Sequence, residues 1–158
     1  MTTIHRALAL LPTLAGALTL AACMDCSQAG CGSQLTIDVD LAPTDTVRLE
    51  VCRADVCYGP SELGTSMVTM AYTDDLYMQA YLSDAGGGVT GVRVLADEYD
   101  DRMSLDNPPA DVAWTVRVFN GTQLVVEEAF TPDYAVSYPN GEACGPTCFS
   151  ASRSFTAL

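Results

Sequence analysis

The feature that most restricts the fold of this chain is a strict alternation of apolar and polar residues in short segments. In Gln34–Leu41 every second residue is Leu, Ile or Val, and the residues between them are Thr36, Asp38 and Asp40. Thr46–Cys52 has the same pattern. A period of two matches a strand with one buried face, whereas a helix requires a period near 3.6. Both segments therefore predict half-buried β-strands.

Several other segments have the length and composition of strands, and clusters of Gly, Pro and Asn separate them. They are Met67–Tyr72, Leu76–Leu82, Val89–Ala96, Val112–Phe119, Gln123–Phe130 and Cys148–Phe155. No segment keeps a helical period for more than two turns. Short strands separated by turn signals are typical of an antiparallel β-sandwich. We predict an all-β, immunoglobulin-like sandwich of about 7–8 strands, formed by one domain over residues 34–158.

Asn120-Gly121 predicts the turn of one hairpin. A three-residue loop, Phe119-Asn120-Gly121, would align Trp114 with Val126 and would keep polar and apolar residues on separate faces. A two-residue turn at Asn120-Gly121 would mix them. Because a shift of one residue reverses every side chain, we predict the bulged three-residue loop, with Gly121 in the left-handed conformation and Trp114 in the core.

The first 22 residues have the organisation of an export signal. One positive charge, Arg6, precedes an apolar run from Ala7 to Ala22. This order is typical of a secretory signal peptide, and the run is too short for a comfortable membrane span of about 20 residues. We interpret residues 1–22 as a signal peptide; a buried N-terminal helix is the alternative.

The end of that segment carries a more specific motif. Leu20-Ala21-Ala22-Cys23 resembles the lipobox of bacterial lipoproteins. The resemblance implies that the Cys23 thiol receives a diacylglycerol and that the preceding peptide is removed, which leaves residues 23–33 as lipidated cysteine and short tether. Since two or three acyl chains hold a protein firmly to a bilayer, we expect an extracytoplasmic protein anchored to the cell membrane or the outer membrane. An ordinary secretory signal is the alternative.

The remaining cysteines form three close pairs in the sequence: Cys26 with Cys31, Cys52 with Cys57, and Cys144 with Cys148. An even number in an exported chain favours disulfides. Cys52 and Cys57 would face each other across a hairpin, at a distance that a disulfide spans. We predict three local disulfides. A link between the Cys52 and Cys148 strands is one alternative, and zinc is another, although the spacings and the oxidising compartment disfavour zinc.

The charge and the residue inventory exclude several classes of function. The chain has seven Arg, no Lys and 20 Asp plus Glu, a net charge of −13, which argues against binding nucleic acid. The single histidine, His5, lies in the predicted signal peptide. Without imidazole or Lys, the mature protein would lack the usual nucleophile-activating bases. We expect no enzyme activity and no cofactor; a carboxylate-dependent glycan hydrolase is the alternative.

Six acidic residues lie in or beside residues 97–111, the longest stretch without a strand pattern: Asp97, Glu98, Asp100, Asp101, Asp106 and Asp111. Calcium takes six to eight oxygen ligands, so these residues are candidate calcium ligands. Their spacing is not that of an EF-hand. An exposed loop on an acidic protein is the alternative interpretation.

Three tyrosines, Tyr72, Tyr77 and Tyr81, are candidates for an aromatic surface on one sheet. Such a surface stacks against sugar rings or against a partner's side chains, although tyrosine also suits strands that have one wet face. The combination of lipobox and sandwich resembles small lipoproteins of high-GC bacteria. Our leading hypothesis is a non-catalytic envelope module that binds a protein or a glycan or has a structural role. An exposed aromatic patch would favour binding, and uniformly charged faces would favour a spacer.

Overall fold

The chain folds into strands, and the computed structural model describes residues 33–63, 67–84, 88–98, 111–139, 141 and 147–157. Within those residues there are ten strands and no helix. The strands are β1 (Ser33–Thr44), β2 (Val47–Arg53), β3 (Val56–Leu63), β4 (Met67–Tyr72), β5 (Leu76–Asp84), β6 (Val89–Glu98), β7 (Trp114–Asn120), β8 (Gln123–Phe130), β9 (Ala135–Ser137) and β10 (Cys148–Thr156).

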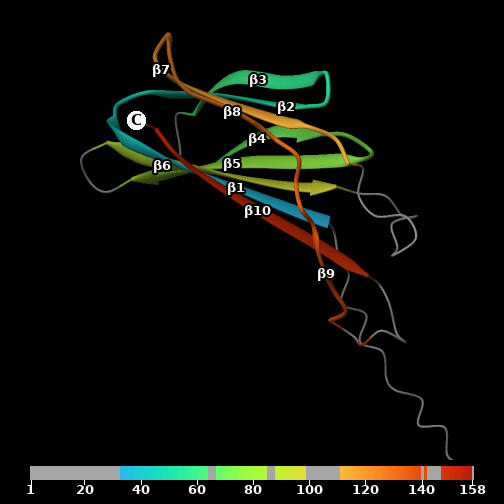
Figure 1. Ribbon diagram of the computed structural model, residues 1–158. Helices are drawn as coiled ribbons and strands as arrows, with labels where there is room; N and C mark the ends of the chain where they lie inside the picture. The colour runs from blue at the N-terminus through green and yellow to red at the C-terminus, as the bar shows by residue number, and fades with distance from the viewer. Residues whose placement is uncertain are drawn as a thin grey trace, which may run out of the picture.

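The strands form two sheets, which lie one above the other (Figure 1). The larger sheet has the order β4-β5-β6-β1-β10-β9, and the smaller has the order β3-β2-β7-β8. Buried residues of both sheets form one continuous hydrophobic core between them. The all-β sandwich predicted from the sequence is therefore confirmed, while its immunoglobulin-like character stays a prediction.

Two strands, β3 and β9, were not predicted. β3 contains Gly59-Pro60, which is a turn signal in a sequence. In the structure β3 is an edge strand, and its pairing with β2 shifts register between Leu49 and Val51, beside this dipeptide. Proline is tolerated at sheet edges and bulges because no ladder hydrogen bond is lost there. β9 has only three residues, which is too short for a period to be recognised.

The first and last strands form the one parallel pair in the described part of the chain. Leu35 of β1 lies opposite Ala151 of β10, and Val39 lies opposite Phe155. The predicted antiparallel sandwich thus contains one parallel pair among its described strands. Parallel neighbours need a long crossover connection, and here the connection is the remainder of the domain, from β2 to β9.

The alternation of apolar and polar residues in the sequence determines which side chains of each strand face the core. Leu35, Ile37 and Val39 of β1 are fully buried against the inward residues of β2 and β7. Burial of a large aliphatic side chain contributes roughly 1.5–3 kcal/mol. Trp114 begins β7, is 0% exposed, and is the largest side chain among the fully buried ones described. The prediction that Trp114 lies in the core is confirmed.

The β7–β8 hairpin has a different loop and register from those predicted. Its turn is Gly121-Thr122, with Gly121 in the left-handed region at φ 59°. Trp114 lies opposite Phe130 and not opposite Val126. The predicted three-residue loop and its register were therefore wrong, although the inward orientation of Trp114 was right.

The position of the turn accounts for most of the difference, because the first paired residues are Asn120 and Gln123 and not Val118 and Thr122. A bulge in β8 adds one more residue to the shift. β8 contains an extra residue, Val125, between the partners of Phe119 and Val118. Val125 packs against the core from this position. The shifted register places Glu127 opposite Arg117, whose Nε donates a 2.7 Å hydrogen bond to its carboxylate. The prediction placed the bulge in the loop, whereas the observed bulge lies within β8 at Val125.

Candidate functional site

The outward side of the larger sheet gathers aromatic side chains. β5 turns three alternate residues outward, Tyr77, Gln79 and Tyr81, while the residues between them are buried. β4 adds Tyr72, which lies opposite Tyr77, and Met67, which lies opposite Tyr81. These five residues form the surface that we call the tyrosine face.

The side chains of the tyrosine face contact one another. The Tyr72 and Tyr77 rings meet edge to face, with centroids 5.8 Å apart and planes at 89°. The Tyr81 hydroxyl donates a 2.7 Å hydrogen bond to Gln79, whose amide nitrogen lies 3.4 Å from the Met67 sulfur. Tyr72 is nevertheless 83% exposed. The structure thus brings the three candidate tyrosines to one face, held by mutual contacts and open to solvent.

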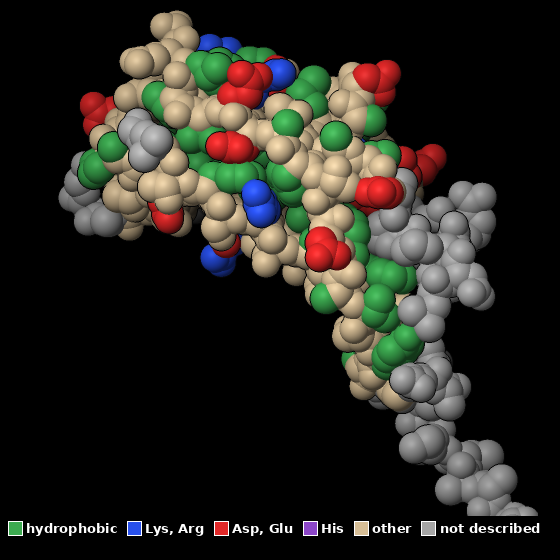
Figure 2. Space-filling model, viewed as in Figure 1, with side chains coloured by type: hydrophobic (Ala, Val, Ile, Leu, Met, Phe, Trp, Pro, Cys, Tyr) green, Lys and Arg blue, Asp and Glu red, His purple; other side chains and the backbone are tan. Residues whose placement is uncertain are grey.

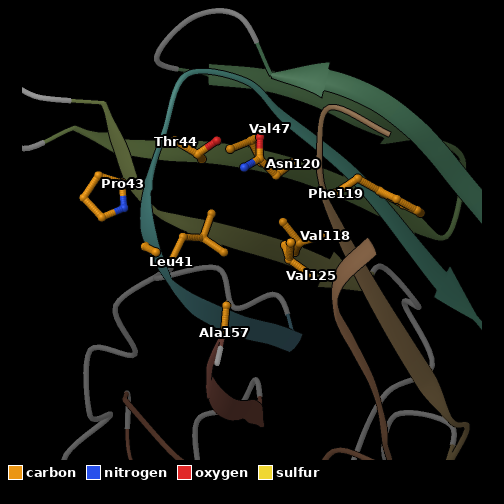
Figure 3. A pocket seen from close by; sticks show the side chains of 10 residues that line it. Leu41, Pro43, Thr44, Val47, Val118, Phe119, Asn120, Val125 and Ala157 are labelled. Atoms are coloured by element: carbon orange, nitrogen blue, oxygen red, sulfur yellow. The ribbon is translucent and has the colours of Figure 1, made fainter. Parts of the chain in front are cut away.

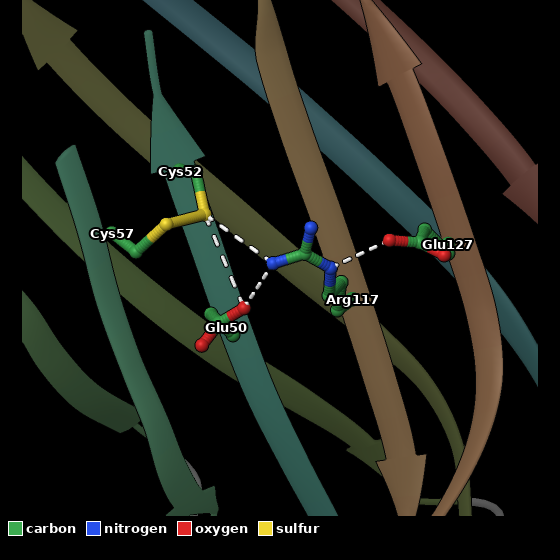
Figure 4. Close-up of a disulfide and its surroundings, with 5 residues drawn as sticks. All are labelled: Glu50, Cys52, Cys57, Arg117 and Glu127. Atoms are coloured by element: carbon green, nitrogen blue, oxygen red, sulfur yellow. Dashed lines mark hydrogen bonds and ion pairs between the residues drawn. A yellow bond between two sulfur atoms is a disulfide. The ribbon is translucent and has the colours of Figure 1, made fainter. Parts of the chain in front are cut away.

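The outward side of the smaller sheet is different, because ion pairs occupy its centre (Figure 4). Arg117 on β7 lies between Glu50 on β2 and Glu127 on β8. Hydrogen bonds to Glu127 and then to Glu50 raise the pKa of Arg117 above its ordinary value. This arrangement pairs the Arg117 guanidinium with carboxylates on both sides and suits a solvent-facing, structural surface.

Cys52 and Cys57 lie opposite each other on β2 and β3 and form a disulfide (Figure 4). This bond confirms one predicted local pair and excludes the alternative link between Cys52 and Cys148. Cys148 is also disulfide-bonded. The other predicted cysteines, Cys23, Cys26, Cys31 and Cys144, lie outside the described residues.

Glu50, Cys52 and Cys57 bring three candidate metal-ligand atoms within 4.8 Å of one another. The disulfide removes two of them, because the thiolate and not the disulfide sulfur is the metal ligand. The Cys52 sulfur also lies 4.0 Å from a Glu50 carboxylate oxygen. Because a disulfide sulfur carries no hydrogen, this approach is a contact and not a hydrogen bond. This cluster is therefore not a zinc site.

The acidic residues proposed as calcium ligands are only partly described. Asp97 and Glu98 are consecutive in β6 and point to opposite faces of the sheet. Asp97 accepts a 3.1 Å hydrogen bond from Gln34, while Glu98 is buried in the sandwich. Asp111 is exposed. Asp100, Asp101 and Asp106 lie outside the described residues. The two β6 carboxylates therefore do not face a common ion.

Glu98 instead joins a buried polar cluster at one end of the sandwich. Its carboxylate is 1% exposed and accepts hydrogen bonds from Arg53 at 3.2 and 3.4 Å and from the Tyr134 hydroxyl at 3.2 Å. Asp75 lies 4.0 Å from the same guanidinium. The contacts connect β6 of one sheet to β2 of the other, so the cluster fixes how the sheets meet.

The alternation of β2 and β6 contains a signal for this cluster, but the predictions from the sequence did not include it. In β2 the inward positions are Val47, Leu49, Val51 and Arg53, and in β6 Glu98 continues the inward series that contains Val94 and Ala96. If the inward series of each strand is extended by one step, Arg53 of β2 and Glu98 of β6 both fall in the interior, where their charges are opposite. A buried charge requires a partner, and the pair would then have been predicted.

Tyr134 should make the stability of the domain sensitive to alkaline pH. Burial, and then the charge of Glu98, raise the pKa of Tyr134 above its ordinary value of 10.0. Above about pH 10 the unfolded chain loses this proton while the folded chain keeps it, so the folded state binds more protons and stability falls as pH rises. Urea unfolding at several alkaline pH values should show a steeper loss in the parent than in Tyr134→Phe. Parallel losses would contradict this prediction.

A small cavity lies at the end of the sandwich near the β7–β8 turn (Figure 3). Its volume is about 100 Å³, and its wall includes Leu41, Val47, Val118, Phe119 and Val125. Ligand pockets of proteins usually measure about 300–1,000 Å³. The cavity is therefore smaller than a typical ligand pocket.

Charged groups are distributed without a basic cluster on the face shown in Figure 2, where acidic side chains are scattered and few basic ones lie among them. In the described residues no helix is long and apolar enough to cross a membrane.

Comparison with protein families, curated proteins and solved structures finds no match. The tyrosine face is thus identified by its chemistry and geometry alone.

Proposed function

We propose that this chain is a non-catalytic, lipid-anchored protein of the cell envelope that binds a partner through the tyrosine face. The observation that carries the proposal is Tyr72, which is 83% exposed although its ring is held against Tyr77. Tyrosine rings supply a large, rigid contact area at low entropic cost. The centre of the opposite sheet is occupied by ion pairs around Arg117, and its described aromatic contact is the cation–π pair of Arg48 and Phe119. A binding role is therefore favoured over a spacer.

The location rests on the lipobox and is supported by the cysteine chemistry. Leu20-Ala21-Ala22-Cys23 supplies the acylation motif. The Cys52–Cys57 disulfide is in keeping with an oxidising compartment outside the cytoplasm. A domain moored by acyl chains at its N-terminal side would keep both sheets in the aqueous phase.

Cys23→Ser should abolish membrane anchoring. Without the thiol no thioether to diacylglycerol can form, so the variant should pass from the detergent phase to the aqueous phase in a detergent phase-partition experiment. Intact mass spectrometry should show diacylglycerol on the parent and none on the variant. Cys26→Ser is the matched control and should stay lipidated. A parent protein of unmodified, full-length mass would refute the anchoring.

Tyr72→Ala combined with Tyr77→Ala should weaken binding to envelopes at least tenfold, which corresponds to about 1.4 kcal/mol. The probe is the mature chain with Cys23→Ser, sedimented with washed envelopes of the source cells. Tyr72 is highly exposed, so the fold should survive, and the melting temperature verifies this. The matched control is Arg48→Ala with Phe119→Ala, a cation–π pair with a 5.9 Å separation on the smaller sheet. Equal losses in both variants would refute the tyrosine face as the binding surface.

A further inference from the structure

We infer that the partner of the tyrosine face is an uncharged polysaccharide, which crosses the strands of the larger sheet from Tyr72 to a hydroxyl-lined groove beside β10. This inference rests on the proposed function and names the ligand of the same face. It follows from the register of the sheet, the lining of the groove and the charges along the path.

The register aligns five outward residues in a single row across the sheet. Tyr72 lies opposite Tyr77, Tyr77 opposite Asp97, Asp97 opposite Gln34, and Gln34 opposite Ser150. Neighbouring strands are about 4.8 Å apart, so the row spans about 19 Å from the first strand to the last. Such a row suits an extended chain better than a compact small molecule.

The far end of the row opens into a groove between β1, β10 and the segment that leads into β9. The groove has a volume of about 470 Å³, and its polar lining is Gln34, Thr36, Asp133, Ser150 and Ser152. Gln34 and Ser150 belong to both the row and the groove. The aromatic pair and the polar groove are therefore parts of one continuous path.

The groups along this path match the chemistry of a sugar chain. Aromatic rings at one end can stack against the apolar face of a sugar ring. Serine and threonine hydroxyls and the Gln34 amide both donate and accept hydrogen bonds, and the carboxylates of Asp97 and Asp133 accept them. The Gln34 amide already donates to Asp97 at 3.1 Å, which orients both groups at the centre of the row.

Charge excludes an acidic polysaccharide. Asp97 lies in the row and Asp133 in the groove. Of the two arginines on the larger sheet near the path, Arg93 is paired with Asp38 at 2.6 Å, and Arg153 stacks on Phe155. The whole chain carries a net charge of −13. An anionic ligand would therefore be repelled, whereas an uncharged one would not.

The composition of the path also favours a glycan over a protein. The cores of protein–protein interfaces are depleted in Ser, Asp and Ala. Here the groove is lined by Ser150, Ser152, Asp133 and Ala135. The polar half of the path thus lacks the apolar centre that a protein partner would bury.

The test measures sedimentation of the mature Cys23→Ser chain with uncharged polysaccharides (cellulose, chitin and mannan) and with acidic alginate beads. We expect binding to at least one uncharged polysaccharide and none to alginate. Gln34→Ala and Ser150→Ile should weaken that binding at least tenfold. Ser154→Ile is the matched control, because Ser154 is exposed on the same strand but does not line the groove; it should change binding less than twofold.

Each other result overturns the inference. Preference for alginate contradicts the charge argument, and binding that ignores Gln34 and Ser150 contradicts the path. Protease treatment of the envelopes separates the two proposals. In one outcome, envelope binding depends on the tyrosines and is abolished by protease, and no polysaccharide is bound. The partner is then a protein, so the proposed function stands and the inference of a polysaccharide ligand is wrong. If the combined Tyr72→Ala and Tyr77→Ala substitutions leave envelope binding unchanged, the proposed function itself is wrong.

Discussion

Arg53→Ala is expected to destabilise the domain by about 3 kcal/mol, measured by urea unfolding. The variant would leave the Glu98 carboxylate, 1% exposed, inside the sandwich without its positive partner. An uncompensated charge in the interior costs far more than the lost contact alone. The matched control is Arg93→Ala, whose ion pair with Asp38 is exposed and should cost about 0–1 kcal/mol.

Replacing both members of the buried pair separates charge from packing. Arg53→Met with Glu98→Met fills similar volume with apolar side chains and should recover most of the stability lost in Arg53→Ala, since such exchanges are often neutral or stabilising. An Arg53→Ala chain as stable as the parent would show that water reaches Glu98 freely. A double variant as unstable as Arg53→Ala would assign the loss to packing.

Trp114→Ala is expected to cost about 3–5 kcal/mol, because it removes the largest fully buried side chain and leaves a cavity. Trp114→Phe should cost much less. The indole Nε1 is buried and has no hydrogen-bond partner in the described part of the chain, so phenylalanine removes an unsatisfied donor while it keeps much of the volume.

Urea unfolding of both Trp114 variants provides the measurement, with Tyr72→Ala as the control. Tyr72 is 83% exposed, and substitution of such a residue usually changes stability by less than about 0.5 kcal/mol. If Trp114→Phe were as damaging as Trp114→Ala, the indole donor would have a partner that stabilises it.

The alternation in the sequence was sufficient to predict the sandwich, because burial of one face per strand is a local property. Leu35, Ile37 and Val39 are two residues apart, so a helix would not place all three on one buried face, whereas a strand does. The same reasoning failed where tertiary context decides. The Val125 bulge inserts one residue into an otherwise regular ladder, and β3 accommodates Gly59-Pro60 because it lies at an edge.

The candidate site was predicted in part for a related reason. Tyr77 and Tyr81 share a face because they are four residues apart on a strand, which the sequence alone indicates. The alignment of Tyr77 with Asp97, Gln34 and Ser150 depends on how three other strands pair. In particular, β10 adds to β1 in parallel from the far end of the chain. No local pattern in the sequence indicates that β1 and β10 pair.

The position of β1 has a mechanical consequence for a moored protein. Residue 33 begins a strand that is held on one side by β6 and on the other by β10, each over most of its length. Tension entering at Ser33 would act along the strand and would load many backbone hydrogen bonds at once. A pull perpendicular to the strand would instead break these hydrogen bonds one at a time. A tether at Ser33 would thus pull on a strand that is hydrogen-bonded to neighbours on both sides.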